Sequence, residues 1–333
     1  MKAAILKERG VISIEDVETP RPGPGEVVVK VSYCGICGSD LRSVASGAAA
    51  GAIMGHEPSG VIAEIGEGVS NWSVGQRVTP IPFDPCWHCY ECLHGTPHMC
   101  RNTAVIGSLR LPGAFAEYLK VKASQLYATP DEITDQEATL NEPLAVSLHA
   151  VLLSQLKVGD SVAIIGAGPI GLMAIHCSKL AGAKGIYVAQ RSEPRASMAK
   201  QVGADIVINP DKEDFRRAVR QQTGIGADVC LECVGSAEAF QLAIRAVRPC
   251  GRVVLVAGGG PTEVIPGELL RRELEIKGSL GYWTEFADGL ELLRLRKIDT
   301  KGMITKVVPL NDIQEAFNEL LQARNHIKVL IAS

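Results

Sequence analysis

The second half of the chain alternates short apolar runs with longer amphipathic stretches. The predicted strands occupy residues 162–165, 186–189, 206–208, 228–231, 253–256 and 275–279, and the first of them is an uninterrupted apolar run. Uninterrupted apolar runs of this length are typical of strands buried on both faces of a parallel sheet. The pattern therefore predicts a doubly wound parallel sheet of the α/β class between Asp160 and Ser279.

The first part of the chain, up to residue 125, consists of short β-like runs separated by glycine and proline. The clearest runs are 27–33, 60–65, 77–81 and 116–121. This spacing predicts an irregular all-β barrel or sandwich. Residues 134–158 read as helical, and the chain closes on a predicted strand, Lys328–Ile331, that can return to the first domain.

Length, charge and hydropathy then narrow the class of protein. A chain of 333 residues, 46% of them apolar, can form two domains with sizeable cores. The net charge of −3, with acids and bases interspersed, predicts no nucleic-acid partner and no membrane partner. No apolar run approaches the ~20 residues of a membrane span, and the opening apolar stretch is too short for a signal peptide. We therefore expect a cytoplasmic protein.

A glycine motif joins the first strand of the predicted sheet to the helix after it. Gly166, Gly168 and Gly171 have G-x-G-x-x-G spacing, and Pro169 and Ile170 lie between the last two. Such glycines allow a tight turn, a close approach to a pyrophosphate and close packing of helix on strand. The helix N-terminus also offers N–H groups to phosphates. The motif predicts a dinucleotide site, with an ordinary glycine-rich turn as the alternative.

Four closely spaced cysteines form the strongest metal-binding pattern in the sequence. They have C-x2-C-x2-C-x7-C spacing and are Cys86, Cys89, Cys92 and Cys100. Four thiolates can surround one tetrahedral zinc ion, and a site closed in this way is structural. An iron–sulfur cluster and a set of free cysteines are the alternatives. The histidines of this segment read as surface residues, because four thiolates already complete the shell.

A second, looser group combines one cysteine with a histidine and a glutamate. Cys37 precedes the adjacent pair His56 and Glu57 in the predicted β region. A catalytic zinc has three protein ligands of these types and one open position. The spacing alone is a weak signal, because such combinations also arise by chance.

The other cysteines read as structural. Cys34 lies three residues before the metal candidate, and in an extended strand it points to the opposite face. Cys230 and Cys233 are also three residues apart, in a predicted buried strand. Cys177 and Cys250 have no partner spacing and are expected in the core. We therefore assign no redox or metal role to these cysteines.

Together these motifs resemble zinc-containing members of the medium-chain dehydrogenase/reductase family, on the polyol and threonine dehydrogenase side. The matching segments are Cys34–Asp40, Gly55–Glu57, the four-cysteine segment, Asn141–Leu144 and Gly166–Gly171. The resemblance implies a GroES-like β-barrel catalytic domain, residues 1–145 and 285–333, and a Rossmann domain, residues 146–284. It also implies two zinc ions per subunit and a homodimer or homotetramer.

The resemblance also assigns roles to the looser metal group. Cys37, His56 and Glu57 match the catalytic zinc ligands of the polyol branch. Glu142 matches a carboxylate beside that zinc, which can exchange with water as a ligand. A residue at the N-terminus of a helix is the other interpretation of Glu142.

Two departures from the family pattern concern the substrate. Where a histidine of a proton relay is frequent, this chain has Arg42, which cannot pass a proton at neutral pH. We therefore expect the proton to leave through Ser39 and water. The small residues of Ser46–Ala52 predict a more open pocket, suited to a bulky or apolar alcohol. Hydride is expected to pass to a nicotinamide ring under the glycine loop that includes Gly258.

The residues after the second strand of the sheet predict the cofactor. An acid at this position normally binds the ribose 2′-hydroxyl of NAD. Here the position is Gln190, with Arg191 and Arg195 after it. A missing carboxylate removes repulsion against a 2′-phosphate, with which Arg191 can pair. The sequence thus predicts NADP in preference to NAD, and Gln190 bound to the 2′-hydroxyl of NAD is the alternative.

The predicted function is a zinc-dependent alcohol dehydrogenase or carbonyl reductase that transfers hydride between a secondary alcohol and NADP. An NAD-dependent polyol or threonine-type dehydrogenase is the first alternative. A non-redox zinc-binding or scaffold protein is the second, and as a nucleic-acid binder it would need a basic face. A zinc-free reductase would lack both metal groups, and a lyase or epimerase would show no net turnover of nicotinamide.

Overall fold

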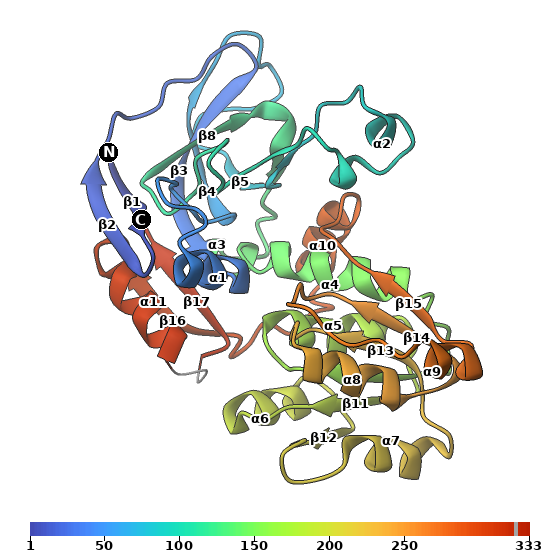
Figure 1. Cartoon of the computed structure of the whole chain (residues 1–333). Coiled ribbons are helices and arrows are strands. Elements are labelled where there is room, and N and C mark those ends of the chain that lie inside the picture. Colours follow the sequence, from blue (N-terminus) through green and yellow to red (C-terminus); the bar gives the residue numbers. More distant parts are fainter. Residues whose placement is uncertain (323–325) are drawn as a thin grey trace. The chain divides into compact units, whose positions relative to one another are not determined.

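The computed structural model describes residues 1–322 and 326–333, which divide into two compact units (Figure 1). Unit 1 comprises Met1–Glu142, Phe286–Arg296 and Ile304–Ser333, and unit 2 comprises Pro143–Glu285 and Lys297–Met303. The chain therefore leaves unit 1, builds most of unit 2 and returns, so that both chain ends belong to unit 1. None of the described helices is long and apolar enough to cross a bilayer.

Unit 1 is built mainly from strands. They are β1 Lys2–Glu8, β2 Val11–Asp16, β3 Glu26–Gly35, β4 Glu57–Ile65, β5 Arg77–Pro80, β6 Phe83–Asp84, β7 Ala104–Val105, β8 Tyr118–Lys122, β9 Leu126–Ala128, β16 Ile304–Pro309 and β17 Lys328–Ala332. Seven of them form one sheet in the order β16-β17-β3-β4-β5-β9, in which β8 also pairs with β3. The helices are α1 Gly38–Ser46, α2 Tyr90–Leu93, α3 Asp135–Ala138, α10 Glu285–Arg294 and α11 Ile313–Gln322, with three-residue helical turns η1 Pro97–Met99, η2 Ala123–Gln125 and η3 Leu310–Asp312.

The last strand completes this sheet. β17 runs antiparallel to β3, with Leu330 opposite Gly35 and Ile331 opposite Cys34. The prediction that the end of the chain returns to the first domain is therefore confirmed. Cys34 is fully buried in the core of unit 1, as expected.

Unit 2 contains a six-stranded parallel sheet with helices between its strands. The elements are α4 Asn141–Leu153, β10 Ser161–Ile165, α5 Pro169–Leu180, β11 Gly185–Ala189, α6 Glu193–Gln201, β12 Ile206–Ile208, α7 Phe215–Thr223, β13 Ala227–Glu232, α8 Ala237–Ala246, β14 Val247–Leu255, α9 Pro266–Arg272 and β15 Glu275–Gly278. The strand order is β12-β11-β10-β13-β14-β15, and every neighbouring pair is parallel. This is the order of a dinucleotide-binding doubly wound sheet, so the predicted fold class is confirmed.

One expectation from the sequence is wrong, and another stays a prediction. Cys250 is exposed rather than in the core; it lies within β14, where its φ is 57° and the pairing with β13 shifts register. In the small-residue segment, the N–H of Gly51 donates to the carbonyl of Leu6 at 2.7 Å, and the N–H of Leu6 donates to Ala52 at 3.1 Å. Small side chains there allow two backbones to approach each other. The expectation of an open pocket stays a prediction.

Candidate zinc and nucleotide sites

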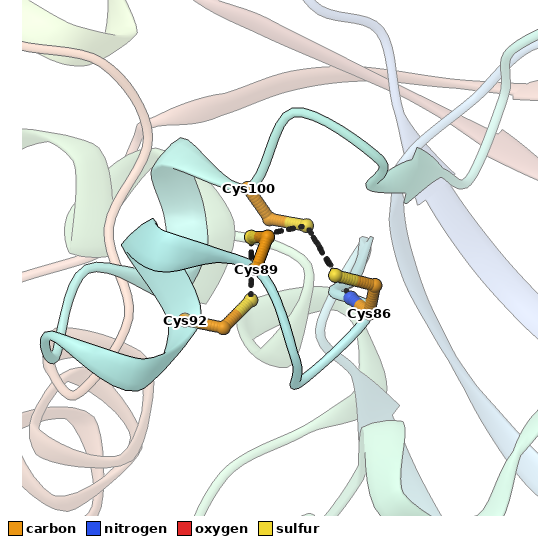
Figure 2. Close-up of side chains that lie close together, drawn as sticks. All are labelled: Cys86, Cys89, Cys92 and Cys100. Atoms are coloured by element: carbon orange, nitrogen blue, oxygen red, sulfur yellow. Dashed lines mark hydrogen bonds between the residues drawn. The ribbon is translucent and has the colours of Figure 1, made fainter.

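The four-cysteine segment folds into a compact loop of unit 1 whose sulfur atoms converge (Figure 2). The sulfur of Cys89 lies 3.5 Å from that of Cys92 and 3.7 Å from that of Cys100, and Cys100 lies 3.5 Å from Cys86. Ligand sulfurs at about 2.3 Å from a tetrahedral zinc would be about 3.8 Å apart. The donor set therefore fits a closed four-sulfur zinc site.

Short turns and shared hydrogen bonds prepare these thiols for a cation. Cys89 caps α2, which contains Cys92, and η1 ends at Cys100. The pKa of Cys86 is lowered to about 6, mainly because the backbone N–H of His88 donates to its sulfur. A backbone N–H also lowers the pKa of Cys89, but burial and hydrogen bonds with neighbouring side chains raise it to about 12. A bound cation would stabilise the thiolate form of all four side chains.

The predicted surface histidines of this loop contact its backbone. The Nδ1 atom of His88 lies 2.7 Å from the carbonyl oxygen of Cys86, and that of His94 lies 2.7 Å from the carbonyl oxygen of Tyr90. Neither ring belongs to the set of converging donors.

The looser group also comes together in unit 1. The ligand atoms of Cys37, His56 and Glu57 all lie within 4.8 Å of one another. Cys37 is the N-cap of α1, and its sulfur accepts the N–H of Ser39 at 3.5 Å. His56 and Glu57 stand where β4 begins, beside the end of β3. Folding of the sheet therefore brings two distant segments to one place.

Asp40 orients two members of this group. One of its oxygens accepts the N–H of Cys37 at 2.9 Å, and the other lies 3.6 Å from Nδ1 of His56. Burial lowers the pKa of His56, but the charge of Asp40 and the hydrogen bond to it raise this pKa well above its usual value. Nδ1 is thus engaged by a carboxylate, which leaves Nε2 as the ring donor for a metal.

A buried lysine, which the sequence interpretation missed, forms an ion pair with Glu57, the third member of this group. Nζ of Lys328, the first residue of β17, lies 2.8 and 2.5 Å from the two carboxylate oxygens of Glu57, and it also donates to the carbonyl of Ile36 at 3.1 Å. The side chains of Lys328 and Glu57 are both only 1% exposed. Burial lowers the pKa of Lys328, but the charges of Glu57, Cys37 and Glu142 and the hydrogen bond to Glu57 together raise it. The sequence offered one sign of this buried lysine, which is a charged residue at the start of the apolar run Val-Leu-Ile.

Glu142 lies near this group without belonging to its converging donors. It is buried in the first turn of α4, and its charge helps to raise the pKa of Lys328. The structure therefore brings Cys37, His56 and Glu57 together, and Glu142 stays outside the 4.8 Å set.

The glycine motif forms the turn between β10 and α5 in unit 2. Gly166 has a φ of 91°, and a side chain on it would collide with Val234. A side chain on Gly171 would lie 1.9 Å from the carbonyl oxygen of Gly166. Gly168 caps α5, and Pro169 opens the helix, so the next N–H groups, including that of Ile170, point out of its N-terminus. The strand order changes direction between β10 and β13, and this is where ligands bind in such sheets.

Side chains from the neighbouring elements surround this turn. The amide oxygen of Gln190, just after β11, accepts the N–H of Ala167 at 2.8 Å. The Nη1 atom of Arg195 lies 3.8 Å from the position that a Cβ atom on Gly168 would occupy. The turn thus combines an open glycine with a cation beside it, which fits a diphosphate.

A second pair of glycine loops lies at the same edge of the sheet. A side chain on Gly235 would lie 2.5 Å from the carbonyl oxygen of Gly258, and one on Gly259 would lie 2.1 Å from that of Gly235. One carboxylate oxygen of Glu232 accepts the N–H groups of Val234 and Gly235 at 2.7 and 2.8 Å. Burial raises the pKa of Glu232. These contacts fix the loop that follows β13 against the loop that contains Gly258.

Comparison with known proteins defines the class to which this fold and these sites belong. Residues 23–131 match the family model of the alcohol dehydrogenase GroES-like domain, and residues 169–294 match that of the zinc-binding dehydrogenase. The chain belongs to the zinc-containing alcohol dehydrogenase superfamily, and it is an NAD(P)-dependent oxidoreductase. The GroES-like and Rossmann architecture implied by the resemblance is thereby confirmed.

Individual relatives match almost the whole chain. L-threonine 3-dehydrogenase of Pyrococcus horikoshii is 38% identical over 98% of this chain and 97% of its own. (R,R)-butanediol dehydrogenase of Bacillus subtilis is 35% identical over 99% of both chains.

Solved structures show relatives with either cofactor. A putative zinc-binding dehydrogenase of Sinorhizobium meliloti 1021, bound to NADP, has a TM-score of 0.94 and 32% identity, covering 100% of this chain and 99% of its own. An alcohol dehydrogenase of Escherichia coli CFT073, complexed with NADH, has a TM-score of 0.93 and 31% identity, covering 100% and 99%. The fold alone therefore does not choose between the two cofactors.

Proposed function

We propose that this dehydrogenase transfers hydride between a secondary alcohol, or its ketone or aldehyde, and NADP, with NADP preferred over NAD. One observation carries the choice of cofactor: β11 is followed by Gln190 instead of a carboxylate, and by the guanidinium of Arg191. A carboxylate at this point would repel a 2′-phosphate, whereas an amide does not. The guanidinium can pair with that phosphate.

The proposed catalytic zinc site consists of Cys37, His56 and Glu57. The convergence of their ligand atoms within 4.8 Å supports this proposal, as does the mixed donor set, which leaves one position open. A bound zinc ion supplies Lewis acidity towards a hydroxyl or carbonyl oxygen, while the nicotinamide accepts or provides the hydride. Asp40 holds the ring of His56, and Lys328 holds the carboxylate of Glu57.

Two further residues complete the proposed site. Ser39 is half-buried in the first turn of α1, beside the sulfur of Cys37. Its hydroxyl can accept the alcohol proton and pass it to water, which the permanently charged Arg42 cannot do. Glu142 is proposed as the carboxylate that exchanges with water beside the metal.

The second zinc ion is proposed to be structural. Cys86, Cys89, Cys92 and Cys100 supply four sulfurs and no position for substrate. Metal bound there would stabilise the folded loop.

An NAD-dependent polyol or threonine-type dehydrogenase is a second candidate function. The observation that favours it is the pairing of Arg191 with Asp211 and Glu238 in the structure. These carboxylates occupy donors that a 2′-phosphate would use.

We also propose that the protein is a cytoplasmic homodimer or homotetramer. β15 is an edge strand of the sheet of unit 2, and Leu270 and Leu280 nearby are 78% and 64% exposed. Exposed edges with apolar neighbours are suited to association. A reducing compartment would preserve the thiolates of both proposed zinc sites.

The function is tested with the purified, zinc-loaded protein. NADP and NAD are supplied separately with secondary alcohols, polyols, hydroxy acids and bulky cyclic alcohols, and nicotinamide absorbance is followed. NADP-linked oxidation of secondary alcohols is expected. NAD-linked oxidation confined to polyols or threonine would replace the proposal by the second candidate. An unchanged NADPH affinity of Arg191→Ala would refute the role of this arginine.

A further inference from the structure

Arg191 is held by two carboxylates from different parts of unit 2. Its Nε atom lies 3.0 Å from Oδ1 of Asp211, which follows β12, and its Nη2 atom lies 2.6 Å from Oε1 of Glu238, in the first turn of α8. The three side chains are 52%, 57% and 70% exposed, in that order. The sequence interpretation did not include the two acids, because they lie 20 and 47 residues away.

The local backbone fixes this arrangement. Asn209 donates to the carbonyl oxygen of Arg191 at 3.4 Å, and its side-chain oxygen accepts the N–H of Asp211 at 3.0 Å. On the other side, Ser236 caps α8 by accepting the N–H of Ala239 at 3.1 Å. The segments that carry Asp211 and Glu238 are therefore both anchored by hydrogen bonds of their own.

The geometry of the guanidinium makes this pairing relevant to cofactor choice. Arginine grips a phosphate through two parallel N–H groups of its planar fork. Nε and Nη2 form one such fork, and here it is divided between two carboxylates. The pair of acids and the single cation leave this cluster with one net negative charge. A 2′-phosphate meets repulsion from that charge, whereas the neutral 2′-hydroxyl of NAD does not.

We propose that Asp211 and Glu238 are specificity-determining residues, which weaken NADP binding relative to NAD by engaging Arg191. This inference rests on the proposed function, in which the adenosine ribose binds beside Gln190 and Arg191. The affinity for NADP consequently exceeds that for NAD by only a small factor, and these two acids determine that factor. Removing either negative charge widens the preference without altering the glycine motif or the proposed zinc sites.

The test uses the full-length variants Glu238→Gln and Asp211→Asn. Dissociation constants of NADPH and NADH are measured by nicotinamide fluorescence at low and at high ionic strength. Each variant is expected to bind NADPH about 2- to 5-fold more tightly, the range that corresponds to the coupling energy of an exposed ion pair. NADH binding should stay the same. High ionic strength should reduce the gain, because salt screens exposed charges.

Glu213→Gln is the matched control. Glu213 is exposed in the same segment as Asp211 and makes no bond to Arg191, so the variant changes the net charge equally without freeing the guanidinium. Its NADPH affinity should equal that of the parent protein. Adding Arg191→Ala to Glu238→Gln should remove the gain.

Two results would overturn the proposal. One is an unchanged NADPH affinity in both Glu238→Gln and Asp211→Asn, and the other is an equal gain in Glu213→Gln. In either case, dinucleotide binding by the parent protein would leave the proposed function intact. A parent protein that binds neither dinucleotide would contradict the proposed function itself, and the inference with it.

Discussion

The two groups of candidate metal ligands in unit 1 are constructed in opposite ways. The four sulfurs come from one loop of 15 residues, Cys86–Cys100, and the sulfur–sulfur contacts join residues at most 14 positions apart. The other group joins the N-cap of α1 to the start of β4, and its buried cation, Lys328, lies 271 residues from Glu57. One group is a local loop, and the other is part of the sheet core.

This difference determines what each group needs in order to keep its shape. Four thiols in a small loop have little apolar surface to bury, so their arrangement depends on a cation. The sheet holds Cys37, His56 and Glu57 through strand pairing, through Asp40 and through the ion pair with Lys328. We therefore expect metal removal to disorder the first group and to leave the second one assembled but inactive.

The largest effect is expected from Cys37→Ser. Loss of a ligand from the proposed catalytic zinc site should lower kcat about 1,000-fold or more, because Lewis acidity contributes several kcal/mol to the reaction. The thermal midpoint should change little, since the sheet persists. Steady-state kinetics and calorimetry measure the two quantities. A large drop in the midpoint with activity retained would show that the roles of the two sites have been exchanged.

Lys328→Met tests whether the sheet core depends on its buried ion pair. Removing the cation leaves the carboxylate of Glu57 buried and uncompensated, which should cost about 3–5 kcal/mol of unfolding free energy in zinc-free protein. Zinc should restore part of this loss, because the metal supplies positive charge to the same carboxylate. Denaturant unfolding with and without zinc gives both values.

The neighbouring strand supplies the control for this substitution. Lys306 on β16 pairs with Glu319, and both side chains are 40% exposed. Lys306→Met should change the unfolding free energy by less than about 1 kcal/mol, with no response to zinc. Equal costs for the two variants would contradict a special role for Lys328.

Cys92→Ser should act on stability rather than on chemistry. The variant should lose one bound zinc ion and become sensitive to proteolysis within the loop, with a thermal midpoint lower by about 5 °C. Elemental analysis, limited proteolysis and calorimetry report on these changes. The exposed Cys250, replaced by serine, should change none of them. Full zinc content in Cys92→Ser would contradict the four-sulfur assignment.

Asp40→Asn is expected to have the smallest effect of the series. An amide still accepts a hydrogen bond but lacks the charge that holds the ring of His56, so zinc affinity at the proposed catalytic site should fall about 10- to 100-fold. The sulfur loop should keep its zinc. Competition with a chelator separates the two sites, and equal loss from both would remove the distinction between them.

The sequence predicted local features better than long-range ones. The four-cysteine site, the glycine turn and the six parallel strands depend on neighbouring residues, although β14 begins at Val247 rather than at 253. The ion-pair partner of Glu57, Lys328, and those of Arg191, Asp211 and Glu238, could not be predicted. Strand pairing and helix placement bring these partners in from distant segments. Sequence spacing contains no information about such long-range contacts. The candidate ligands Cys37, His56 and Glu57 gave only a weak signal by spacing, and the family resemblance strengthened their assignment.

The place of β17 at the end of the chain also bears on biosynthesis. A ribosome releases all of unit 2, and most of unit 1, before Lys328 emerges. Until then, the nascent chain lacks the strand that pairs with β3 and the cation that neutralises Glu57. Domains fold as units during synthesis. The insert is thus completed first, and the proposed catalytic metal site matures after it.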